Sequence, residues 1–341
     1  MSLSRIVLFV CVAVLGVIGL MGVFKKIPAK KADKAHETLE VLAKRIEIPS
    51  APEMIKTVKA EVKVETLETT PVRLTQVAES KEEDFPEVDR VDQLFRVNGT
   101  KFPIVETIDY TSRVAWLKGR PAWIADYASY YNTSRHFIAR SLNGKPDYLT
   151  QQVSTGSRFN VFRKDKNIHF YLLVDLSRCK MALYYVDLDA KERALIKTYT
   201  VGVGRIDPTK PSGYLTPTGT YSLGSKIAVY KPGTMGYFLD EKVEMVRVFG
   251  TRWIPFDQEI EACTEHSKGY GIHGAPWEVH PKTKQLVENH DGIGKQYSDG
   301  SISLSLEDIE ELFSIVITKP TYVVIVRDFK EAKLPGVEVP L

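Results

Sequence analysis

The carboxyl-terminal half of the chain is a succession of short β-prone segments, and this pattern restricts the fold more than any other feature. The segments are rich in Val, Ile, Tyr and Thr, and turn residues such as Gly, Pro and Asp separate them. Strands are expected at 168–175, 181–186, 194–203, 253–256, 269–274 and 321–327, with a further strand after the Pro and Gly residues of 216–221. Many short strands with frequent turns and little helix are typical of β-sandwiches and barrels. The sequence therefore predicts a mainly β domain of that kind.

One helix is predicted among these strands, beginning at Ser305. Ser305 followed by Asp308 matches a capping box in which Asp replaces the usual Glu. Apolar residues then recur at helical spacing until Pro320 ends the pattern: Leu306, Ile309, Leu312, Phe313 and Val316. Such a stripe most often packs into a core. Ser301 is expected just ahead of the amino end of this helix, where free N–H groups and the helix dipole favour a developing oxyanion.

Composition and charge narrow the class of function. The 341 residues are 43% hydrophobic and 26% charged, which is typical of a globular protein with one or two cores. A net charge of +3 is too small to indicate a nucleic-acid-binding protein. Three cysteines do not make a disulfide framework. Cys11 lies in an apolar amino-terminal segment, and Cys179 and Cys263 are expected to remain unpaired as small apolar residues.

The amino terminus predicts a membrane anchor. Residues 6–24 carry no charge, and a rise of about 1.5 Å per residue makes the run just long enough to cross a bilayer. We expect residues 1–35 to be an uncleaved signal anchor, because sites for signal cleavage are weak here. Residues 36–100 are expected to be an extended linker. Lysines after the apolar run would keep the body in the cytoplasm by the positive-inside rule, whereas the envelope chemistry inferred below places it outside.

A small module is predicted at 107–164, with the order strand, helix, helix, strand. Thr133 is the expected N-cap of its second helix. Four features follow in the order of the LysM family, which the module resembles: Ile124-Ala125, Asn132-Thr-Ser, Leu142-Asn143 and Gly156 before an alternating strand. The resemblance implies binding of N-acetylglucosamine polymers such as peptidoglycan. The alternative is a small αβ packing domain without such a ligand.

Five motifs of the predicted β domain carry a second resemblance. They are Val174-Asp-Leu-Ser, Pro217-Thr-Gly-Thr, Ile272-His-Gly, Ser298-Asp-Gly-Ser-Ile and Val323-Val-Ile-Val-Arg. In this order, residues 168–328 resemble the catalytic domain of the YkuD-type L,D-transpeptidases, with 329–341 as a tail. The resemblance implies a β-sandwich or barrel with one helix after the active-site loop. It also implies cross-linking of peptidoglycan stem peptides through a cysteine acyl-enzyme, with no metal or organic cofactor.

The family signature assigns roles to individual residues. His273 takes the position of the general base, Ser301 that of the nucleophilic Cys, and Gly300 that of the glycine before it. The remaining signature positions are expected to contact substrate: Gly274, Ser298, Asp299 and Ser303. Asp299 stands where the family often has His, and Ser303 stands where it has Arg or Asn. The loop between His273 and Ser301 is longer than is usual in the family.

Serine at the nucleophile position leaves more than one function open. A Cys thiol has a pKa of about 8.5 and reacts as the thiolate, whereas a Ser hydroxyl must give its proton to a base within about 3 Å. The first hypothesis is an envelope acyltransferase in which Ser301 attacks and His273 is the base. The second is an inactive relative that binds peptidoglycan as an anchor or scaffold. A minor third makes Cys263 a displaced nucleophile near His266 or His273.

Other aromatic and histidine residues are weaker candidates for the site. Trp253, Trp277 and Tyr297 either line the substrate cleft or belong to the core, and His280 and His290 lack the ligand spacing of a zinc site. The expected partners are peptidoglycan glycan strands and stem peptides, together with the membrane, and no nucleic acid. The expected location is the bacterial cell envelope, with the body on the outer, periplasmic side of the cytoplasmic membrane.

Overall fold

The computed structural model describes residues 84–144 and 152–339. The predicted signal anchor at 1–35 and residues 36–83 of the predicted linker lie outside this part of the chain. Among the residues that are described, no helix is both long enough and apolar enough to cross a membrane.

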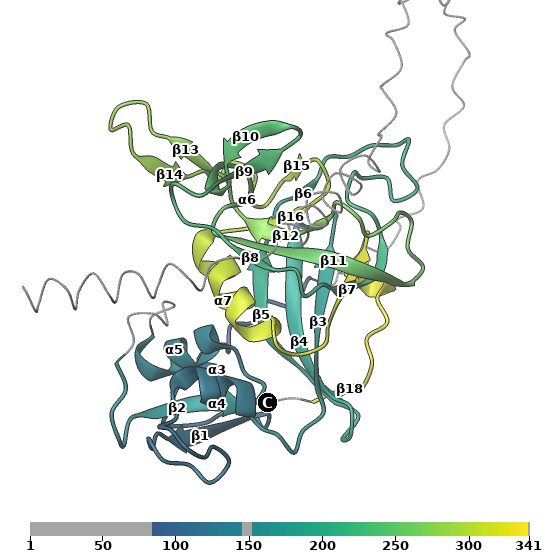
Figure 1. The fold of residues 1–341 in the computed structure, drawn as a ribbon. Coiled ribbons are helices and arrows are strands. Elements are labelled where there is room, and N and C mark those ends of the chain that lie inside the picture. Colours follow the sequence, from purple (N-terminus) through teal and green to yellow (C-terminus); the bar gives the residue numbers. More distant parts are fainter. Residues whose placement is uncertain (1–83, 145–151, 340–341) are drawn as a thin grey trace, which may run out of the picture. The chain divides into compact units, whose positions relative to one another are not determined.

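The main domain is built on one ten-stranded mixed β-sheet (Figure 1). Its strands are β3 (Ile168–Asp175), β4 (Lys180–Asp187), β5 (Glu192–Thr200), β7 (Gly219–Leu223), β8 (Ala228–Val229), β11 (Arg252–Glu261), β12 (Gly271–Gly274), β16 (Ile302–Leu304), β17 (Thr321–Val326) and β18 (Val337–Glu338). From edge to edge the order is β16, β12, β11, β7, β17, β3, β4, β5 and β18, and β8 pairs with β11 outside this path. The mainly β prediction is therefore confirmed.

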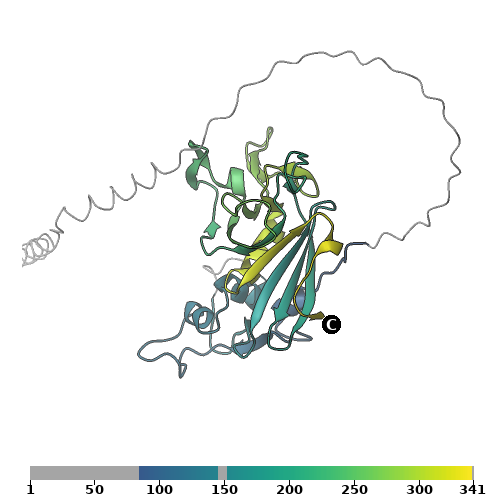
Figure 2. The ribbon, with the colours of Figure 1, turned by 90° about the vertical axis from the view of Figure 1, so that its right-hand side faces the viewer.

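The centre of the sheet joins strands that are distant in sequence. β3 and β4 are antiparallel, whereas β17 runs parallel to β3 and antiparallel to β7. Figure 2 shows the long strands side by side. Just beyond β5, Gly202 and Ser303 of β16 exchange two backbone hydrogen bonds, 2.8 and 2.9 Å long. The expected sandwich or barrel is thus a single sheet, which curls until the segment after β5 reaches β16.

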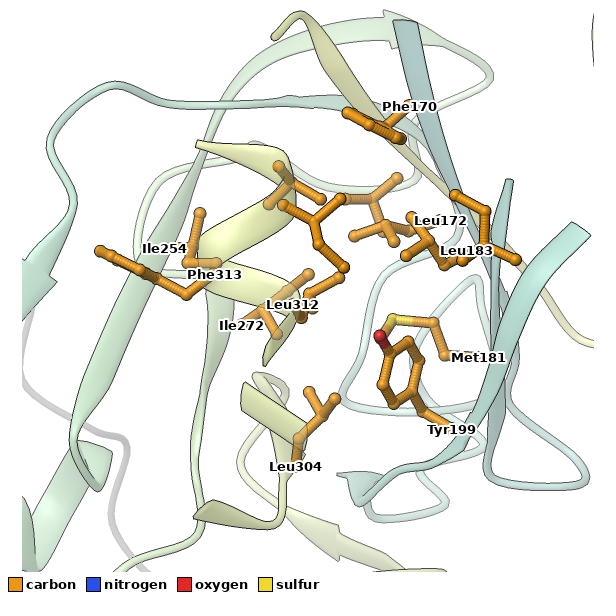
Figure 3. Close-up of a cluster of buried hydrophobic side chains, with 14 of the residues drawn as sticks. Phe170, Leu172, Met181, Leu183, Tyr199, Ile254, Ile272, Leu304, Leu312 and Phe313 are labelled. Carbon is orange, nitrogen blue, oxygen red and sulfur yellow. The ribbon is translucent and has the colours of Figure 1, made fainter. Parts of the chain in front are cut away.

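Helix α7 (Leu306–Val316) packs on this sheet as its apolar stripe predicts. Leu312 and Phe313 are buried in the main core with side chains of β3, β4 and β5 (Figure 3). Burial of each large apolar side chain contributes about 1.5–3 kcal/mol. The predicted cap is also present, because Ser305 Oγ accepts from Asp308 N at 3.3 Å and donates to Asp308 Oδ2 at 2.7 Å. The helix is therefore fixed by its own sequence at the start and by the core along its length.

The module has the predicted order of strand, helix, helix and strand. Its elements are β1 (Val105–Asp109), α4 (Ile124–Tyr130), α5 (Arg135–Asn143) and β2 (Arg158–Phe162), and the two strands pair antiparallel. Apolar side chains of α4, α5, β2 and the segment between β1 and α4 form a small core: Tyr110, Ala122, Tyr127, Ala128, Ile138, Phe159 and Val161. Other residues of the module, Phe137 and Phe162, belong instead to the main core. The module therefore shares buried surface with the main domain.

The predicted N-cap of α5 at Thr133 is wrong by one residue. Ser134 Oγ accepts the hydrogen bond from Phe137 N, at 2.9 Å. The Thr133 hydroxyl instead accepts from Phe162 N of β2, also at 2.9 Å. Both residue types can cap a helix, and the neighbouring strand decides between them because it requires the Thr133 hydroxyl.

Both predicted ends of the folded part need correction. Residues 84–100, predicted as linker, bury Phe85 and Leu94. The predicted tail at 329–341 supplies β18, which pairs with β5. The folded part of the chain therefore begins by residue 84 and continues past 328, because apolar and strand-forming residues at both ends complete the main domain.

The remaining elements of the described chain are short, and most of them lie near the end of the sheet that holds β12 and β16 (Figure 1). They are α3 (Asp92–Phe95), β6 (Val203–Gly204), β9 (Met235–Phe238), β10 (Glu241–Glu244), α6 (Val246–Phe249), β13 (Trp277–Val279), β14 (Leu286–Glu288), β15 (Gln296–Ser298) and a 3-10 helix (Phe329–Glu331). β9 pairs with β10, β13 with β14, and β6 with β15. Most of these were not predicted, since strands of two to four residues carry little periodicity.

Candidate functional site

Three predicted site residues lie on neighbouring strands: His273 and Gly274 on β12, which pairs with β11, and Ser303 on β16. Pairing aligns Trp253 with His273 and His273 with Ser303, so one row of side chains crosses the three strands. The adjacent row is apolar and buried in the core: Ile254, Ile272 and Ile302. Successive residues of a strand point to opposite faces. The row that contains His273 therefore lies on the face turned away from the core.

His273 is held in a defined protonation state. Its ring is buried, and Nδ1 lies 2.8 Å from the carbonyl oxygen of Gly274. A carbonyl only accepts, so Nδ1 carries the proton and, in the neutral ring, Nε2 keeps its lone pair. Burial lowers the pKa of His273, opposed by the bond to Gly274, so the ring is neutral at pH 7. The rings of Phe249 and Trp253 flank it at 5.7 and 6.1 Å. Nε2 is therefore prepared to accept a proton.

The loop before Ser301 is tied together by side-chain bonds to its own backbone. Ser298 Oγ donates to the Ser301 carbonyl at 2.6 Å and accepts from Gly300 N at 3.1 Å. Thr216 Oγ1 donates to the Gly300 carbonyl at 2.8 Å and accepts from Gly204 N at 2.7 Å. Both contacts of Thr216 are buried. Ser298 is therefore a structural residue of the loop, and its hydroxyl is already used there.

Gly300 occupies a position that only glycine fits. Its φ is +128°, and an added Cβ would lie 2.5 Å from the Tyr270 ring and 2.8 Å from the Leu215 carbonyl oxygen. The ring cannot move freely, because Tyr270 OH donates to Glu265 Oε2 at 3.0 Å and Lys210 holds the same carboxylate at 2.8 Å. The glycine of the signature is therefore required by the backbone next to Ser301.

Ser301 is half-buried and directly precedes β16. Extending the parallel pairing of β12 and β16 by one residue places it opposite Gly271, on the face that His273 occupies. Its Cα lies on the diagonal from His273, a separation of roughly 7–8 Å. Within the described part of the chain, no hydrogen bond joins the Ser301 hydroxyl to His273. A side-chain movement must therefore bring the two groups together before any proton transfer.

The amino end of α7 does not reach Ser301. The whole of β16 and Ser305 lie between them, roughly 13 Å of extended chain. The first helical N–H, that of Leu306, donates to Glu288 Oε1. The predicted stabilisation of an oxyanion by this helix is therefore wrong, because a short strand stands where the sequence suggested direct entry into the helix.

Ser303 and Asp299 point in different directions. Ser303 is buried, and its hydroxyl lies against the backbone of Gly202. Asp299 is exposed, with Oδ1 2.5 Å from Arg205 Nη2. The structure thus places Ser303 in the row of His273 and turns Asp299 towards Arg205.

Two cavities lie beside Tyr270, whose ring contacts Gly300. The larger, about 840 Å³, is bordered by Asp299 and Tyr270, and the smaller, about 400 Å³, by Trp253 and Tyr270. They share the wall formed by residues 268–270. Cavities of this size accept small organic ligands and short peptides. The larger cavity meets the loop at Asp299, and the smaller meets the row at Trp253.

Cys263 lines the larger cavity and is not part of the His273 row. Its thiol donates to the Thr220 carbonyl at 3.1 Å, while the neighbouring His266 side chain is 96% exposed and lies 3.6 Å from Glu259. Cys179 is buried, which raises its pKa to about 11. Both thiols are free. These contacts give Cys263 no base, so they do not favour it as a displaced nucleophile.

The remaining weak candidates lie around the β13–β14 hairpin. Trp277 begins β13, and Tyr297 is 61% exposed in β15. His280 Nδ1 accepts from a backbone N–H within the hairpin. His290 Nε2 lies 3.0 Å from Glu288 Oε2, the side chain that binds the start of α7. These residues therefore support the loop between His273 and Ser301.

Three supporting residues of the site were not predicted as such: Thr216, Phe249 and Tyr270. Thr216 precedes one of the family motifs, yet its hydroxyl bonds to Gly300, 84 positions away. Phe249 and Tyr270 contact the site through ring packing alone. Contacts between such distant segments leave no periodic signal in the sequence.

Comparisons with known proteins bear on the same segment. Residues 169–325 match the family model of the L,D-transpeptidase catalytic domain, YkuD. No curated protein matches the chain. Similar solved structures include Bd1075 from Bdellovibrio bacteriovorus (16% identity, TM-score 0.31) and the helical cell shape determining protein Pgp2 from Campylobacter jejuni (16% identity, TM-score 0.32). The similarity covers 47% and 51% of this chain, and 48% and 54% of those two chains.

The matched segment contains all of the site described above. It begins within β3, ends within β17, and includes His273 and Gly274 of β12 and the segment from Ser298 to Ser303. The chain spans about half of the length of the two solved chains. The candidate site therefore lies wholly within the segment, residues 169–325, that matches the L,D-transpeptidase catalytic domain, YkuD.

Proposed function

We propose that the chain binds peptidoglycan stem peptides and transfers their acyl group through Ser301, with His273 as the general base. The observation that supports this most is the state of His273. Burial keeps its ring neutral and the Gly274 carbonyl holds Nδ1–H, which leaves Nε2 as the base. Ser301 directly precedes β16, and the pairing of β12 with β16, extended by one residue, puts it on the same face as His273.

In the proposed reaction, Ser301 Oγ attacks the carbonyl carbon next to the terminal D-Ala of a tetrapeptide stem. His273 Nε2 takes the hydroxyl proton and then returns it to the departing amine as the C–N bond breaks. An acceptor amine next attacks the serine ester and gives a proton to Nε2. The new amide forms, and Ser301 Oγ regains its hydrogen. A positioned general base contributes about 10²–10⁴-fold to the rate of such a step.

A second candidate is binding of stem peptides without turnover, as an anchor or scaffold. Two observations favour it. The Ser301 hydroxyl is not hydrogen-bonded to His273 in the described part of the chain, and Ser303 is too short and too buried to replace the Arg or Asn of the signature. Under this candidate the same row of residues binds the peptide and the chain contributes no chemistry.

The two candidates predict different results for variants at Ser301. The full chain is incubated with tetrapeptide muropeptides, and products and acyl-enzyme are measured by intact mass. If Ser301 is the nucleophile, wild type forms cross-linked product, and Ser301→Ala lowers its rate at least about 100-fold. Ser154→Ala, an exposed serine in the module, is the matched control and should retain the wild-type rate. Product from Ser301→Cys alone would refute the acyltransferase and favour the scaffold.

We also propose that the module binds glycan strands, and that residues 1–35 anchor the chain in the cytoplasmic membrane with the body outside. The LysM-like motif order supports the first part, as does Trp123, which is 64% exposed at the N-cap of α4. Deleting 107–164 would expose the main core, so a point variant is the better test. Trp123→Ala should weaken binding of the full chain to sacculi about tenfold. Unchanged binding would contradict a glycan site at this surface.

A further inference from the structure

We propose that Arg252 is a positioning residue that holds the His273–Gly274 end of β12 in place, and that the module supports it through α7. The inference rests on the proposed function only in taking His273 as the residue to be positioned. It is carried by continuous contacts from α5 of the module, through α7 and β11, to Gly274.

Arg252 is a buried cation fixed on three sides. It is 7% exposed and precedes Trp253 in β11, so its side chain points to the opposite face, where α7 lies. Nη2 lies 3.1 Å from Glu310 Oε1, and Nη1 donates to the Thr251 carbonyl at 2.8 Å. Cζ lies 5.3 Å from the centroid of the Phe313 ring. A buried guanidinium is costly unless it is paired and hydrogen-bonded, so these contacts determine where it lies.

The backbone next to Arg252 is in contact with the His273–Gly274 end of β12. An added Cβ on Gly250 would lie 2.6 Å from the Gly274 carbonyl carbon and 2.7 Å from the Ala275 carbonyl oxygen. An added Cβ on Gly274 would lie 3.1 Å from Ile309 of α7 and 3.3 Å from Thr251 N. Gly274 therefore cannot shift without displacing β11 or α7. Since its carbonyl binds His273 Nδ1, the direction of the imidazole depends on the same contacts.

The module contacts α7 beside the residues with which Arg252 interacts. The His136 ring lies edge-on to Phe313, with centroids 5.3 Å apart at 87°. Ser134 Oγ donates to the Ser314 carbonyl at 2.5 Å. Phe313 is therefore in contact with α5 of the module and with Arg252 of β11. A displacement of α5 would therefore reach Arg252, and through it the His273–Gly274 end of β12, by way of the Phe313 ring.

If the ion pair between Arg252 and Glu310 were purely structural, it would stabilise the fold and leave His273 unchanged. The test therefore measures a property of the His273 imidazole itself. The probe is hydrogen exchange of the His273 Nδ1 proton, measured by NMR on the full chain with ¹⁵N-labelled histidine. That proton is protected only while the Gly274 carbonyl remains in place. Its exchange rate therefore reports the position of the Gly274 carbonyl at the end of β12, and the measurement requires no substrate.

Arg252→Met is expected to speed this exchange at least about tenfold, in line with the 10–100-fold effects of residues that orient a functional histidine. Arg252→Lys keeps a cation within reach of Glu310 and should recover most of the protection. Arg178→Met is the matched control, because Arg178 also pairs with a carboxylate, Asp175 at 2.8 Å, and lies 5.2 Å from a Phe ring. It should lower the free energy of unfolding without changing exchange at His273.

Unchanged exchange in Arg252→Met would overturn the proposal. Should that variant fail to fold, Glu310→Gln gives the same test, because it removes the partner charge and keeps the size of the side chain. The proposed function is tested separately by alkylation of the thiol in Ser301→Cys. If adding His273→Ala does not slow alkylation, His273 is not the base, and the exchange result still decides the role of Arg252.

The module's part is tested by combining Ser134→Ala with His136→Ala. These substitutions remove contacts to α7 and leave Arg252 in place. Exchange at His273 should rise about threefold, a size typical of coupling through packed side chains. No change would overturn the module's part in the proposal.

Discussion

Lys197→Met is expected to lower the free energy of unfolding by about 3–5 kcal/mol at neutral pH. Lys197 Nζ lies 2.8 Å from Glu311 Oε1, and Tyr199 OH donates to the same oxygen at 3.1 Å. The side chains of Lys197 and Glu311 are 13% and 9% exposed. Removing the ammonium leaves a buried carboxylate without its contacting cation. The cost of that unpaired charge, more than the lost attraction, makes the effect large.

The loss of unfolding free energy in Lys197→Met should become smaller as the pH falls. Burial raises the pKa of Glu311, although Lys197 opposes this shift. A carboxyl whose folded pKa lies above its unfolded value destabilises the fold as pH rises through the folded pKa. Without Lys197 the opposing influence is lost and this pKa rises further. Urea unfolding of Lys197→Met should therefore show a smaller deficit at mildly acidic pH, where Glu311 takes up a proton.

Two variants separate a buried pair from a surface pair. Lys180 pairs with Glu87 at 2.7 Å, but the Glu87 side chain is 62% exposed. Lys180→Met should therefore cost no more than about 1 kcal/mol. Combining Lys197→Met with Glu311→Gln should recover most of the loss, because the amide still accepts from Tyr199 without a charge. If Lys197→Met and Lys180→Met lowered the free energy of unfolding equally, Lys197 and Glu311 would not act as a buried ion pair.

The long strands and α7 could be predicted because the signals that specify them are local. The run 168–175 is β3 in the structure, and its apolar, β-branched and aromatic residues suit a strand with both faces covered. The cap of α7 is a contact between Ser305 and Asp308, three positions apart. Patterns of this kind are complete within one element and do not depend on the rest of the chain.

The site was only partly predictable, because it depends on which strands become neighbours. The resemblance marked His273 and Ser301, but β16 is only three residues long and its pairing with β12 is not visible in sequence. That pairing makes Ser303, and not Ser301, the direct partner of His273. The same pairing moves Ser301 away from the helix that the sequence appeared to place beside it. Register, which tertiary contacts set, is therefore the information that the sequence pattern lacked.

The ends of the folded part were missed for a related reason. Phe85 and Leu94 are isolated apolar residues in a polar stretch, so no periodic pattern identifies them. These residues are buried because other segments pack against them. The centroid of the Phe329 ring, for example, lies 5.2 Å from that of Phe85. A single apolar residue has no predictive weight until its partner is known.

Gly300→Ala is expected to lower the free energy of unfolding by about 2–4 kcal/mol, from backbone strain and overpacking together. The φ of +128° disfavours any side chain, and the new Cβ would meet the Leu215 carbonyl oxygen at 2.8 Å and the Tyr270 ring at 2.5 Å. Neither neighbour moves easily, because one is backbone and the other is hydrogen-bonded to Glu265. The loop itself must then shift, and the bond from Gly300 N to Ser298 Oγ is the first to be lost.

Because Ser301 follows directly, binding of stem peptides should weaken at least about tenfold in Gly300→Ala, measured by titration of the full chain with a tetrapeptide muropeptide. Gly99→Ala is the matched control for backbone strain. Gly99 has a φ of +96° and nothing within 4 Å of an added Cβ. It should cost about 1 kcal/mol and leave binding unchanged. Adding Tyr270→Ala to Gly300→Ala relieves one of the two clashes and should restore part of the stability. If Gly300→Ala behaves like Gly99→Ala in both measurements, the loop is not held by its close contacts, and the position of Ser301 must depend on the pairing of β16 alone.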